Sequence, residues 1–389
     1  MPTADDTPAA TRLDDLPSDR VGPADVLGVP RLPPARIGRI GNRARAGLAR
    51  IHRGAAPPPG QVMEAVLGVL DLAALAALCR LDVPDRLTDP ASPAELAAAS
   101  GVDEDRFTRL IRYAATRGWV RIDRQGLVRA TRLTSFLRRD HPGGWRAWIK
   151  CAAGAEVTAA LSRLDAGLTP DGDAFAAANG APFFDWMRDR PDRHAVFDAA
   201  MSAGGRMHGV VLARSLDWST SRRVCDIGGG DGALLGVLLH HHRHLEGVLL
   251  ELPEVAARAP RRPRVTNVAG DAFTAVPSGC DTYLLVNVVH DWDDEAVVTL
   301  LRGVRHALTT AGPPVSPGRL LVVEAEAHRR PRDDLAVRAD LLMLALTPGG
   351  RERDVAEITH LAEEAGLRTT RVLRLATGDV AYELTAPVN

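Results

Sequence analysis

A histidine directly after an apolar run is the first residue in this chain with a clear chemical use. His290 stands in NVVHDWDDEA, and the apolar residues 282–288 precede it. Imidazole titrates near neutral pH, so a histidine at the end of a strand can act as a general base. Glu324, at the end of another apolar run, and Glu352, in TPGGRERD, can hydrogen-bond that imidazole or a substrate hydroxyl. These residues predict a proton-transfer site, although a histidine that only caps its own loop is the simpler alternative.

A glycine-rich segment predicts a nucleotide-like ligand. Residues 222–232, RRVCDIGGGDG, read as a short buried strand and a tight turn. Gly228 and Gly230 let the backbone turn sharply and approach a ligand closely. The glycine spacing also satisfies the dinucleotide fingerprint, so a nicotinamide-dependent oxidoreductase is one reading. Asp226 disfavours it, because a carboxylate there would repel a pyrophosphate but suits a cationic, amino-acid-bearing cofactor.

Two further acids at strand ends favour one cofactor. Glu251 ends the apolar run 247–252 and can accept hydrogen bonds from both hydroxyls of a ribose. Asp271 offers an acceptor for an adenine amino group, and the following Ala272 and Phe273 bring a ring to pack on it. Acids at three successive strand ends predict S-adenosylmethionine, which becomes S-adenosylhomocysteine after methyl transfer.

Strands and helices must alternate from residue 222 onward to carry these residues. Strands are predicted at 224–227, 248–251, 265–268, 282–288 and 319–324, and helices at 232–242, 253–259, 294–308, 338–345 and 355–365. Two closing strands, 368–375 and 380–385, are expected to pair locally. This order is typical of a doubly wound, Rossmann-like α/β sheet with an antiparallel edge. Ligands of such sheets bind outside the carboxyl ends of the strands, where the acids and His290 are expected to gather.

Residues 61–145 predict a second, mainly helical domain. Ser92 is expected to cap a helix that ends at Gly101, and Asp103 a helix that runs to residue 117. Residues 118–131 alternate like a β-hairpin, which completes a winged helix. The preceding helix, 62–78, is apolar on all sides, so we expect it to be buried in a twofold dimer.

Arginines on the helix 103–117 allow a different function, that of a ligand-sensing, DNA-binding regulator. Arg106, Arg109, Arg112 and Arg117 line this helix, and its opposite face is apolar. A solvated helix face explains the same pattern. The formal net charge of −1 gives no general attraction to nucleic acid or to an anionic membrane, so neither partner is expected.

Composition sets the remaining bounds. With 389 residues, 46% hydrophobic and 25% charged, the chain has the size and composition of a soluble, two-domain protein. Four scattered cysteines and the helix-end run 240–244 predict no metal site. Apolar runs are read as too short to span a membrane, so a cytoplasmic protein is expected. Residues 1–60 are expected to be largely disordered, although 37–51 could form a basic amphipathic helix.

Six motifs, in this order, resemble one enzyme family. CDIGGGDGA, LLELPEV, AGDAF, NVVHDWDDE, LLVVEA and TPGGRERD are similar to those of S-adenosylmethionine-dependent small-molecule O-methyltransferases, which include plant caffeate and flavonoid, hydroxyindole and bacterial polyketide-tailoring enzymes. The resemblance covers about residues 61–387. It implies a winged-helix dimerisation domain at 61–145, a helical linker and pocket wall at 146–210, and a catalytic domain at 211–389, after an N-terminal extension of residues 1–60.

The resemblance also implies a role for each matching residue. His290 would remove the proton of the acceptor hydroxyl, flanked by Glu324 and Glu352. Cofactor contacts are implied for Asp226, Gly228, Gly230, Glu251, Asp271, Ala272, Phe273 and Val286. Glu251 stands where plant members have an aspartate, and Val286 where they have a lysine, so Val286 could contact the cofactor only through its backbone or by packing.

An aromatic molecule with a phenolic hydroxyl is the expected substrate. The acidity of a phenol suits a histidine base, and residues 183–201 concentrate Phe, Trp and Met in a chain that is only 4% aromatic. The expected substrate-binding residues are Phe197, Met201, Asp291 and Met343. We therefore expect an O-methyltransferase of bacterial secondary metabolism, such as antibiotic biosynthesis. A family member that has diverged to other chemistry is the alternative, but such members often lose the histidine.

Overall fold

The computed structural model describes residues 35–310, 318–328 and 335–387. The described chain divides into two compact units. The first contains residues 56–155 and 195–203, and the second contains residues 35–55, 156–194 and those from 204 onward.

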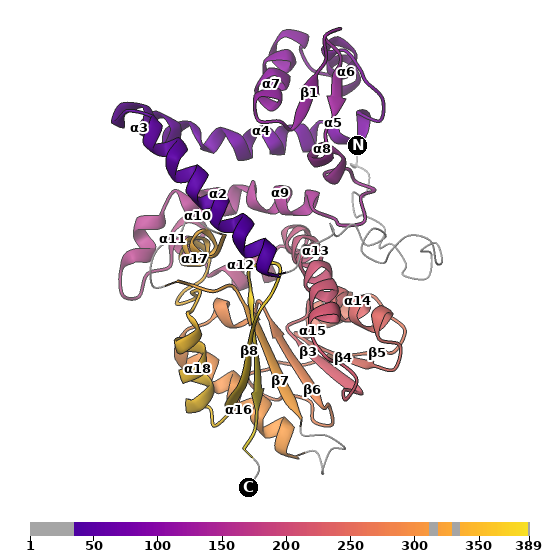
Figure 1. The fold of residues 1–389 in the computed structure, drawn as a ribbon, viewed down its shortest axis with the longest axis vertical. Coiled ribbons are helices and arrows are strands. Elements are labelled where there is room, and N and C mark those ends of the chain that lie inside the picture. The colour runs from indigo at the N-terminus through magenta and orange to yellow at the C-terminus, as the bar shows by residue number, and fades with distance from the viewer. Residues whose placement is uncertain (1–34, 311–317, 329–334, 388–389) are drawn as a thin grey trace. The chain divides into compact units, whose positions relative to one another are not determined.

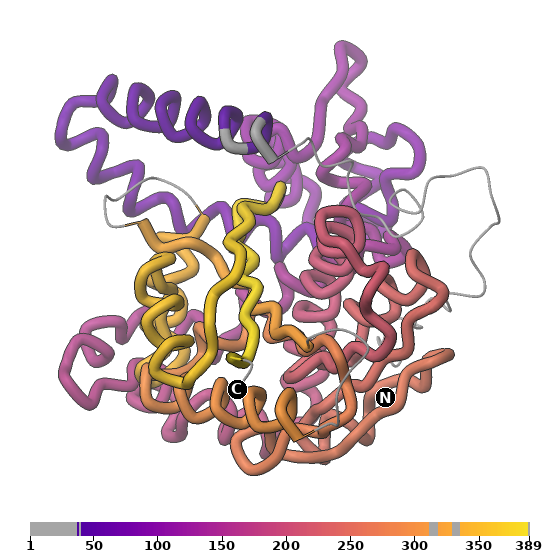
Figure 2. The backbone as a smooth tube through the Cα atoms, turned by 60° about the horizontal axis from the view of Figure 1, so that its bottom comes forward, coloured from indigo at the N-terminus to yellow at the C-terminus, as the bar shows by residue number. Residues whose placement is uncertain are grey.

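A seven-stranded sheet forms the centre of the second unit (Figure 1). Its order is β5-β4-β3-β6-β7-β9-β8. The five parallel strands are β3 (Arg223–Ile227), β4 (Glu246–Glu251), β5 (Val265–Ala269), β6 (Thr282–Val286) and β7 (Arg319–Glu324). The strands β8 (Arg368–Arg374) and β9 (Val380–Thr385) are antiparallel and run side by side near the C-terminus (yellow in Figure 2). The expected doubly wound sheet with an antiparallel edge is confirmed.

The direction of chain progression reverses between β3 and β6. From β3 the chain builds β4 and β5 outward on one side, and it then returns to place β6 on the other side of β3. Such a switch point opens a crevice at the carboxyl ends of the two central strands, because the connections leave in opposite directions. The glycine loop follows β3 and the His290 segment follows β6, so the sheet order brings these two segments to one edge.

Helices cover both faces of this sheet, which explains why its central strands are apolar along their length. One core packs α16 (Asp294–Thr310) and α18 (Val355–Glu364) against the sheet, and the other packs α14 (Ala233–His241) and the C-terminal part of α13 (Pro191–Ser215). Neighbours Tyr283 and Leu284 of β6 point to opposite faces, and both are fully buried. The helix α15 (Pro253–Arg258) lies beside β4 and β5.

A group of short helices adds to the second unit before and after these strands. They are α2 (Ala35–Ala55), α10 (Ala155–Leu161), η2 (Leu164–Leu168), α11 (Ala174–Asn179), α12 (Phe183–Arg188) and α17 (Leu335–Leu346). Phe175 of α11 and Phe183 of α12 meet edge to face, with ring centroids 5.0 Å apart, and both are buried. The aromatic residues of α12 therefore anchor this group, as their concentration in the sequence suggests.

The first unit has the helix, turn, helix and hairpin order that the sequence predicts. Its elements are α3 (Pro58–Leu67), α4 (Val69–Arg80), α5 (Val83–Arg86), α6 (Pro93–Ser100), α7 (Glu104–Thr116), β1 (Val120–Ile122), β2 (Val128–Ala130), α8 (Arg132–Phe136) and α9 (Arg146–Ala152). Ser92 forms a capping box with Glu95, and Asp103 accepts a hydrogen bond from the N–H of Arg106 at 3.0 Å. Phe107 and Ile111 lie in the core of this unit, while the arginines of α7 face solvent.

Residues 35–80 add three points to these expectations. Residues 35–55 form α2, in a segment expected to be disordered, and residues 1–34 lie outside the described part. The helix expected at 62–78 is divided at Gly68, and Val66 and Val69 are 59% and 70% exposed. Residues Pro58–Arg80 are also long and apolar enough to cross a membrane, by length and composition. An apolar sequence shows that a surface will be covered but not by what, so it cannot separate a core helix from an interface helix.

The exposed apolar residues of α3 and α4 predict a second chain on this face. We expect the protein to be a dimer without detergent, because burying apolar surface yields about 25 cal/mol per Å². Replacing both Val66 and Val69 with Glu should produce monomers in light scattering over a range of concentrations. The control Leu168→Glu, at an equally exposed leucine of η2 in the second unit, should remain dimeric. A monomeric wild-type chain, or a dimer that needs detergent, would contradict this prediction.

Candidate active site

His290 lies in the turn that follows β6. The strand ends at Val286, and Asn287 then adopts a left-handed backbone with φ of 54°. Asparagine tolerates this conformation better than most residues, which lets the chain turn at once into η3 (Val289–Asp291). Asp293 then accepts a hydrogen bond from the N–H of Ala296 at 2.8 Å and caps α16. The histidine is therefore held between a strand end and a capped helix.

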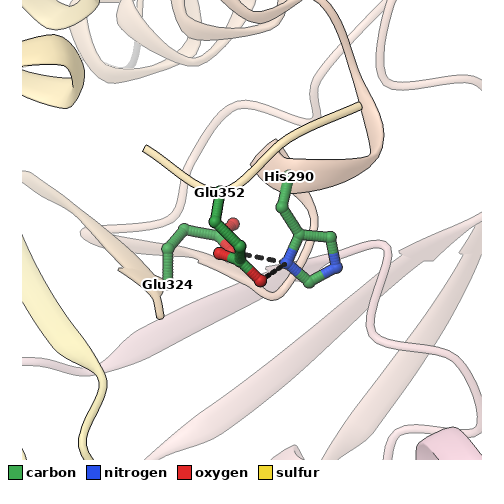
Figure 3. Close-up of side chains that lie close together, drawn as sticks. All are labelled: His290, Glu324 and Glu352. Carbon is green, nitrogen blue, oxygen red and sulfur yellow. Dashed lines mark ion pairs between the residues drawn. The ribbon is translucent and has the colours of Figure 1, made fainter. Parts of the chain in front are cut away.

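Glu324 binds this turn from the end of the neighbouring strand β7. Its Oε1 accepts hydrogen bonds from the N–H groups of Val288 and Val289, at 3.1 and 2.7 Å. Its Oε2 lies 2.9 Å from Nδ1 of His290, as Figure 3 shows. One buried carboxylate thus holds both the backbone and the ring of the histidine segment.

Glu352 approaches the same ring nitrogen from the loop after α17. Its Oε1 lies 3.6 Å from Nδ1 of His290, so both dashed lines in Figure 3 end on one atom. Its backbone N–H donates to Oδ1 of Asp340 at 2.9 Å. One ligand atom from each of His290, Glu324 and Glu352 lies within 4.8 Å of the others, and no other such trio of His, Cys or acidic residues occurs in the described ranges. Because both glutamates face Nδ1, Nε2 is the ring nitrogen left for a substrate proton.

Burial and charge act in opposite directions on this imidazole. Burial lowers the pKa of His290, but the negative charges of Glu324, Asp291 and Glu352 outweigh it and raise that pKa to about 10. Asp291 contributes from the other side of the ring, with Oδ1 3.6 Å from Nε2. Burial also raises the pKa of Glu352 to about 8; the charge of Glu324 adds to this rise, and His290 opposes it. A neutral imidazole in this setting is a strong base, and its conjugate acid is well stabilised.

The glycine loop contains a buried acid that has no hydrogen-bond partner. Asp226 at the end of β3 is 1% exposed, and its Oδ2 makes no hydrogen bond within the described part of the chain. Burial raises the pKa of Asp226 to about 8, and the charges of Glu251 and Asp231 add to the effect. Gly229 lies so close that a Cβ there would collide with this carboxylate. An unpartnered buried acid in a glycine loop fits a ligand that brings donors or positive charge.

The other two strand-end acids are bound to local backbone. Oε1 of Glu251 accepts a hydrogen bond from the N–H of Gly230 at 2.8 Å, and its Oε2 accepts one from Leu252 at 2.9 Å. Oδ1 of Asp271 accepts one from the N–H of Phe273 at 2.9 Å. Glu251 therefore ties β4 to the glycine loop, and Gly228 and Gly230 both adopt the positive φ that a tight loop requires, 69° and 61°.

A row of aromatic rings stands beside these acids. Phe273 meets Trp292 edge to face at 4.7 Å, and Trp292 stacks on Phe184 at 6.1 Å with an interplanar angle of 13°. Trp292 was not among the residues that the sequence singled out, although it lies two positions after His290. Ala272 and Val286, also half-buried, pack against the two cores of the sheet. These rings offer a flat apolar surface beside the histidine turn.

The four expected substrate-binding residues do not all fall within one unit. Asp291 lies beside the His290 ring. Met343 is on α17 three residues after Asp340, so the two share one side of that helix. Phe197 and Met201 lie on α13 within residues 195–203, which belong to the first unit, so their contribution to the site stays a prediction.

Arg353 also holds the histidine segment, and the sequence did not reveal it. This arginine is 2% exposed. It donates hydrogen bonds to the carbonyl oxygens of Val289 and Trp292 at 2.9 and 2.7 Å, and to Asp294 at 2.8 Å. Arg351, two residues earlier, is exposed and contacts only Asp294 and Glu357 among the bonds identified. Sequence alone could not tell these two arginines apart, because both stand in the same charged loop.

The histidine run 240–244 is occupied by local contacts. Nε2 of His242 lies 2.9 Å from the carbonyl oxygen of Ala213, and Nε2 of His244 lies 3.0 Å from that of Trp218. These contacts tie the end of α14 to the end of α13. The run therefore has a structural role, whereas the sequence indicated only a solvated helix end.

The fold and the site together define a class of protein. A doubly wound sheet has a glycine loop with an unpartnered acid at its switch point, and a histidine braced by two glutamates follows the adjacent strand. This is a Rossmann-like methyltransferase arrangement with a histidine beside the crevice of the switch point. Residues 162–368 match the model of the O-methyltransferase domain, and residues 63–140 match that of the O-methyltransferase dimerisation domain. The chain belongs to this O-methyltransferase family.

Two O-methyltransferases and one relative that is named as a hydroxylase are similar to this chain over most of its length. O-demethylpuromycin-O-methyltransferase of Streptomyces alboniger is 32% identical over 371 residues, which are 91% of this chain and 94% of the relative. The structure of NcsB1, an O-methyltransferase from neocarzinostatin biosynthesis in complex with S-adenosylmethionine and 2-hydroxy-5-methyl naphthoic acid, has a TM-score of 0.66 and 31% identity, covering 82% of this chain and 96% of NcsB1. Aclacinomycin 10-hydroxylase RdmB of Streptomyces purpurascens is 34% identical over 292 residues, 70% of this chain and 75% of RdmB. The expected enzyme class and the expected cofactor, S-adenosylmethionine, are confirmed.

The position of Arg353 predicts a loss of turnover without a loss of cofactor affinity. Arg353→Met should lower kcat by roughly ten- to a hundredfold, because a base displaced by a fraction of an ångström is poorly aligned. Affinity for S-adenosylhomocysteine, measured by titration calorimetry, should stay unchanged. Arg351→Met removes the same charge beside Asp294 and should change kcat less than about threefold, as is usual for an exposed ion pair.

Two controls accompany the test of Arg353→Met. Melting temperatures show whether each variant is folded, and Arg353→Lys, which keeps the charge but not the fork of donors, replaces Arg353→Met if that variant does not fold. Equal losses of turnover in the Arg351 and Arg353 variants would show that the loop has no special need of Arg353.

Proposed function

We propose that this enzyme methylates a phenolic hydroxyl of an aromatic small molecule and that His290 is its general base. The observation that carries the proposal is the state of the imidazole: Nδ1 faces Glu324 and Glu352, while Nε2 points away from both of them. A donor at Nδ1 fixes the tautomer in which Nε2 holds the lone pair. That nitrogen is the one that accepts the proton of the substrate hydroxyl.

The residues of the chain then have distinct tasks in the reaction. S-adenosylmethionine, when bound, supplies an activated methyl group on a positively charged sulfur. His290 takes the hydroxyl proton as the oxygen becomes nucleophilic, and Glu324 and Glu352 stabilise the imidazolium that results. Arg353 and Glu324 hold the turn, so the base does not have to be ordered again in each cycle.

The cofactor contacts form part of this proposal. Asp226, with Gly228 and Gly230, would receive the methionine part, since Asp226 is buried and lacks a partner. Glu251 would bind the ribose, because its carboxylate stands at the end of β4 and closes the glycine loop. Asp271, Ala272 and Phe273 would receive the adenine ring, and Val286 would contribute packing only.

The substrate class and the assembly complete the proposal. A flat phenol suits the stacked rings of Phe184 and Trp292; Asp291 directly precedes Trp292 in the chain, and Met343 lies on α17. NcsB1 is described with a hydroxynaphthoic acid, and other relatives are named for the antibiotics puromycin and mitomycin. We therefore propose an antibiotic-type aromatic substrate and a cytoplasmic homodimer formed through the first unit, with neither nucleic acid nor membrane as a partner.

Cofactor specificity predicts a selective rise in melting temperature. S-adenosylhomocysteine should raise the melting temperature in a concentration-dependent way, and NAD should not, because only a ligand of the folded state stabilises it. Glu251→Ala and Asp271→Ala should each weaken binding by about 1.5–3 kcal/mol, the usual value of a hydrogen bond to a charged group. Glu246→Ala, at the opposite end of β4 from Glu251, serves as the control. Unchanged affinity in both test variants would disprove the assigned pocket.

The role of His290 predicts a specific loss of chemistry. His290→Ala should keep its affinity for S-adenosylhomocysteine and lose roughly a hundred- to ten-thousandfold in turnover, the range of a general base. Wild-type turnover should rise with pH, because only the neutral imidazole accepts a proton. Raising the pH should also partly rescue His290→Ala for an acidic phenol, because the phenolate then forms in solution.

Two variants separate this loss from indirect effects. His306→Ala, at an exposed histidine of α16, should behave like the wild type. Glu324→Gln and Glu352→Gln should be milder than His290→Ala, since they orient the base without taking the proton. Wild-type turnover of His290→Ala with a substrate that the enzyme demonstrably methylates would show that catalysis needs no base.

A further inference from the structure

A second buried histidine and acid occur in the same unit as the His290 cluster. His208 of α13 is 5% exposed, and Asp379 stands in the turn between β8 and β9. Nδ1 of His208 lies 3.0 Å from the carbonyl oxygen of Gly204, and Nε2 lies 2.9 Å from Oδ2 of Asp379. The sequence offered no role for this histidine.

The hydrogen bonds of His208 determine its charge. A carbonyl oxygen and a carboxylate oxygen both accept hydrogen bonds and cannot donate them, so each ring nitrogen of His208 must donate. The ring therefore carries two protons and forms an ion pair with Asp379. Burial disfavours the charged form of both groups, but the attraction between His208 and Asp379 is stronger than this effect. The pKa of His208 is therefore raised and that of Asp379 is lowered.

Stability alone does not explain such a pair. Removing two charges from water costs several kcal/mol per ion, and well-packed apolar residues of similar volume are often at least as stable. A buried ion pair is therefore a poor way to fill a core. The role of the pair must therefore depend on its two charges and on the charged groups near them.

The pair stands next to the acids that surround His290. Val380, which follows Asp379, pairs with Glu324 across β9 and β7, so the turn lies beside the strand end that braces the base. Several acids act on the cluster, and they come from different elements: Asp291 of η3, Glu324 of β7, Asp340 of α17, Glu352 of the following loop and Asp379 of the β8–β9 turn. Among the described residues of the second unit, the buried cations are His208 and Arg353, and Arg353 is bound to Asp294 and to backbone carbonyls.

We propose that His208 is a charge-balancing positioning residue, whose imidazolium neutralises Asp379 and so makes it easier for His290 to lose its proton. This inference rests on the proposed role of His290 as the base. An unpaired negative charge near His290 favours the protonated imidazole, and the effect is on the order of one pH unit for charges several ångströms apart in a protein interior. Without His208, the carboxylate of Asp379 would act in that way.

The pH dependence of turnover tests this idea. His208→Gln should move the acid limb of the kcat profile to higher pH by about one unit, while turnover on the alkaline plateau and affinity for S-adenosylhomocysteine stay close to wild type. The double variant His208→Gln with Asp379→Asn should return the limb toward the wild-type position, because the uncompensated acid is gone. A merely structural role would make the double variant no better than the single one. His242→Gln is the matched control, because His242 contacts the carbonyl oxygen of Ala213, which lies elsewhere on α13. This variant should not move the acid limb of the kcat profile.

Three results would overturn the proposed role of His208. A folded His208→Gln variant with an unmoved acid limb overturns the proposal for His208, and so does a double variant that remains shifted. If His208→Gln does not fold, Asp379→Asn replaces it in the test. The Asn carbonyl still accepts from His208, so the acid limb of the kcat profile must move to lower pH. An acid limb that stays or rises overturns the proposal.

His290→Ala is measured in parallel. If it is impaired while the His208 profile is unmoved, only the charge-balancing role fails; if it is fully active, the base itself is wrongly assigned.

Discussion

The contact between the carboxylate of Glu324 and the turn after β6 is the interaction on which the candidate site depends. One oxygen binds two backbone N–H groups and the other faces Nδ1 of His290, so a single side chain contacts both the backbone of the loop and the ring. Parallel pairing of β6 with β7 makes this possible, because it aligns the ends of the two strands. Arg353 binds the carbonyl oxygens of the same turn, so both kinds of backbone group are held.

Charge is the second constraint on this region. Several acids lie close together with little access to water, and each unpaired charge would be costly. The structure meets this cost in three ways: Glu324 accepts backbone donors, Asp379 pairs with His208, and the raised pKa of Glu352, about 8, favours its neutral form at neutral pH. The base is therefore tuned by groups from several distant parts of the chain.

The glycine loop also contains a buried acid, but this acid has a different environment. Asp226 is buried without a partner, although most buried polar atoms in proteins are hydrogen-bonded. A carboxyl in that state makes the loop dependent on its ligand, since a bound donor would satisfy it. Gly229 must lack a side chain to leave room for this acid, and Glu251 closes the loop from β4.

The sequence by itself determined the order of strands and helices, the enzyme class and the cofactor, and it located the strand-end acids and His290 in the chain, because hydrophobic period and the chemistry of single residues are local properties. It predicted that the helix around Val66 and Val69 meets a second chain, and their exposure in the single chain agrees with that prediction. It could not separate Arg353 from Arg351, or assign a use to His208, because the value of a charge depends on partners far away in the chain. Only tertiary structure decided these points: it alone brings strand ends, turns and helices close enough for their charges to act on one another.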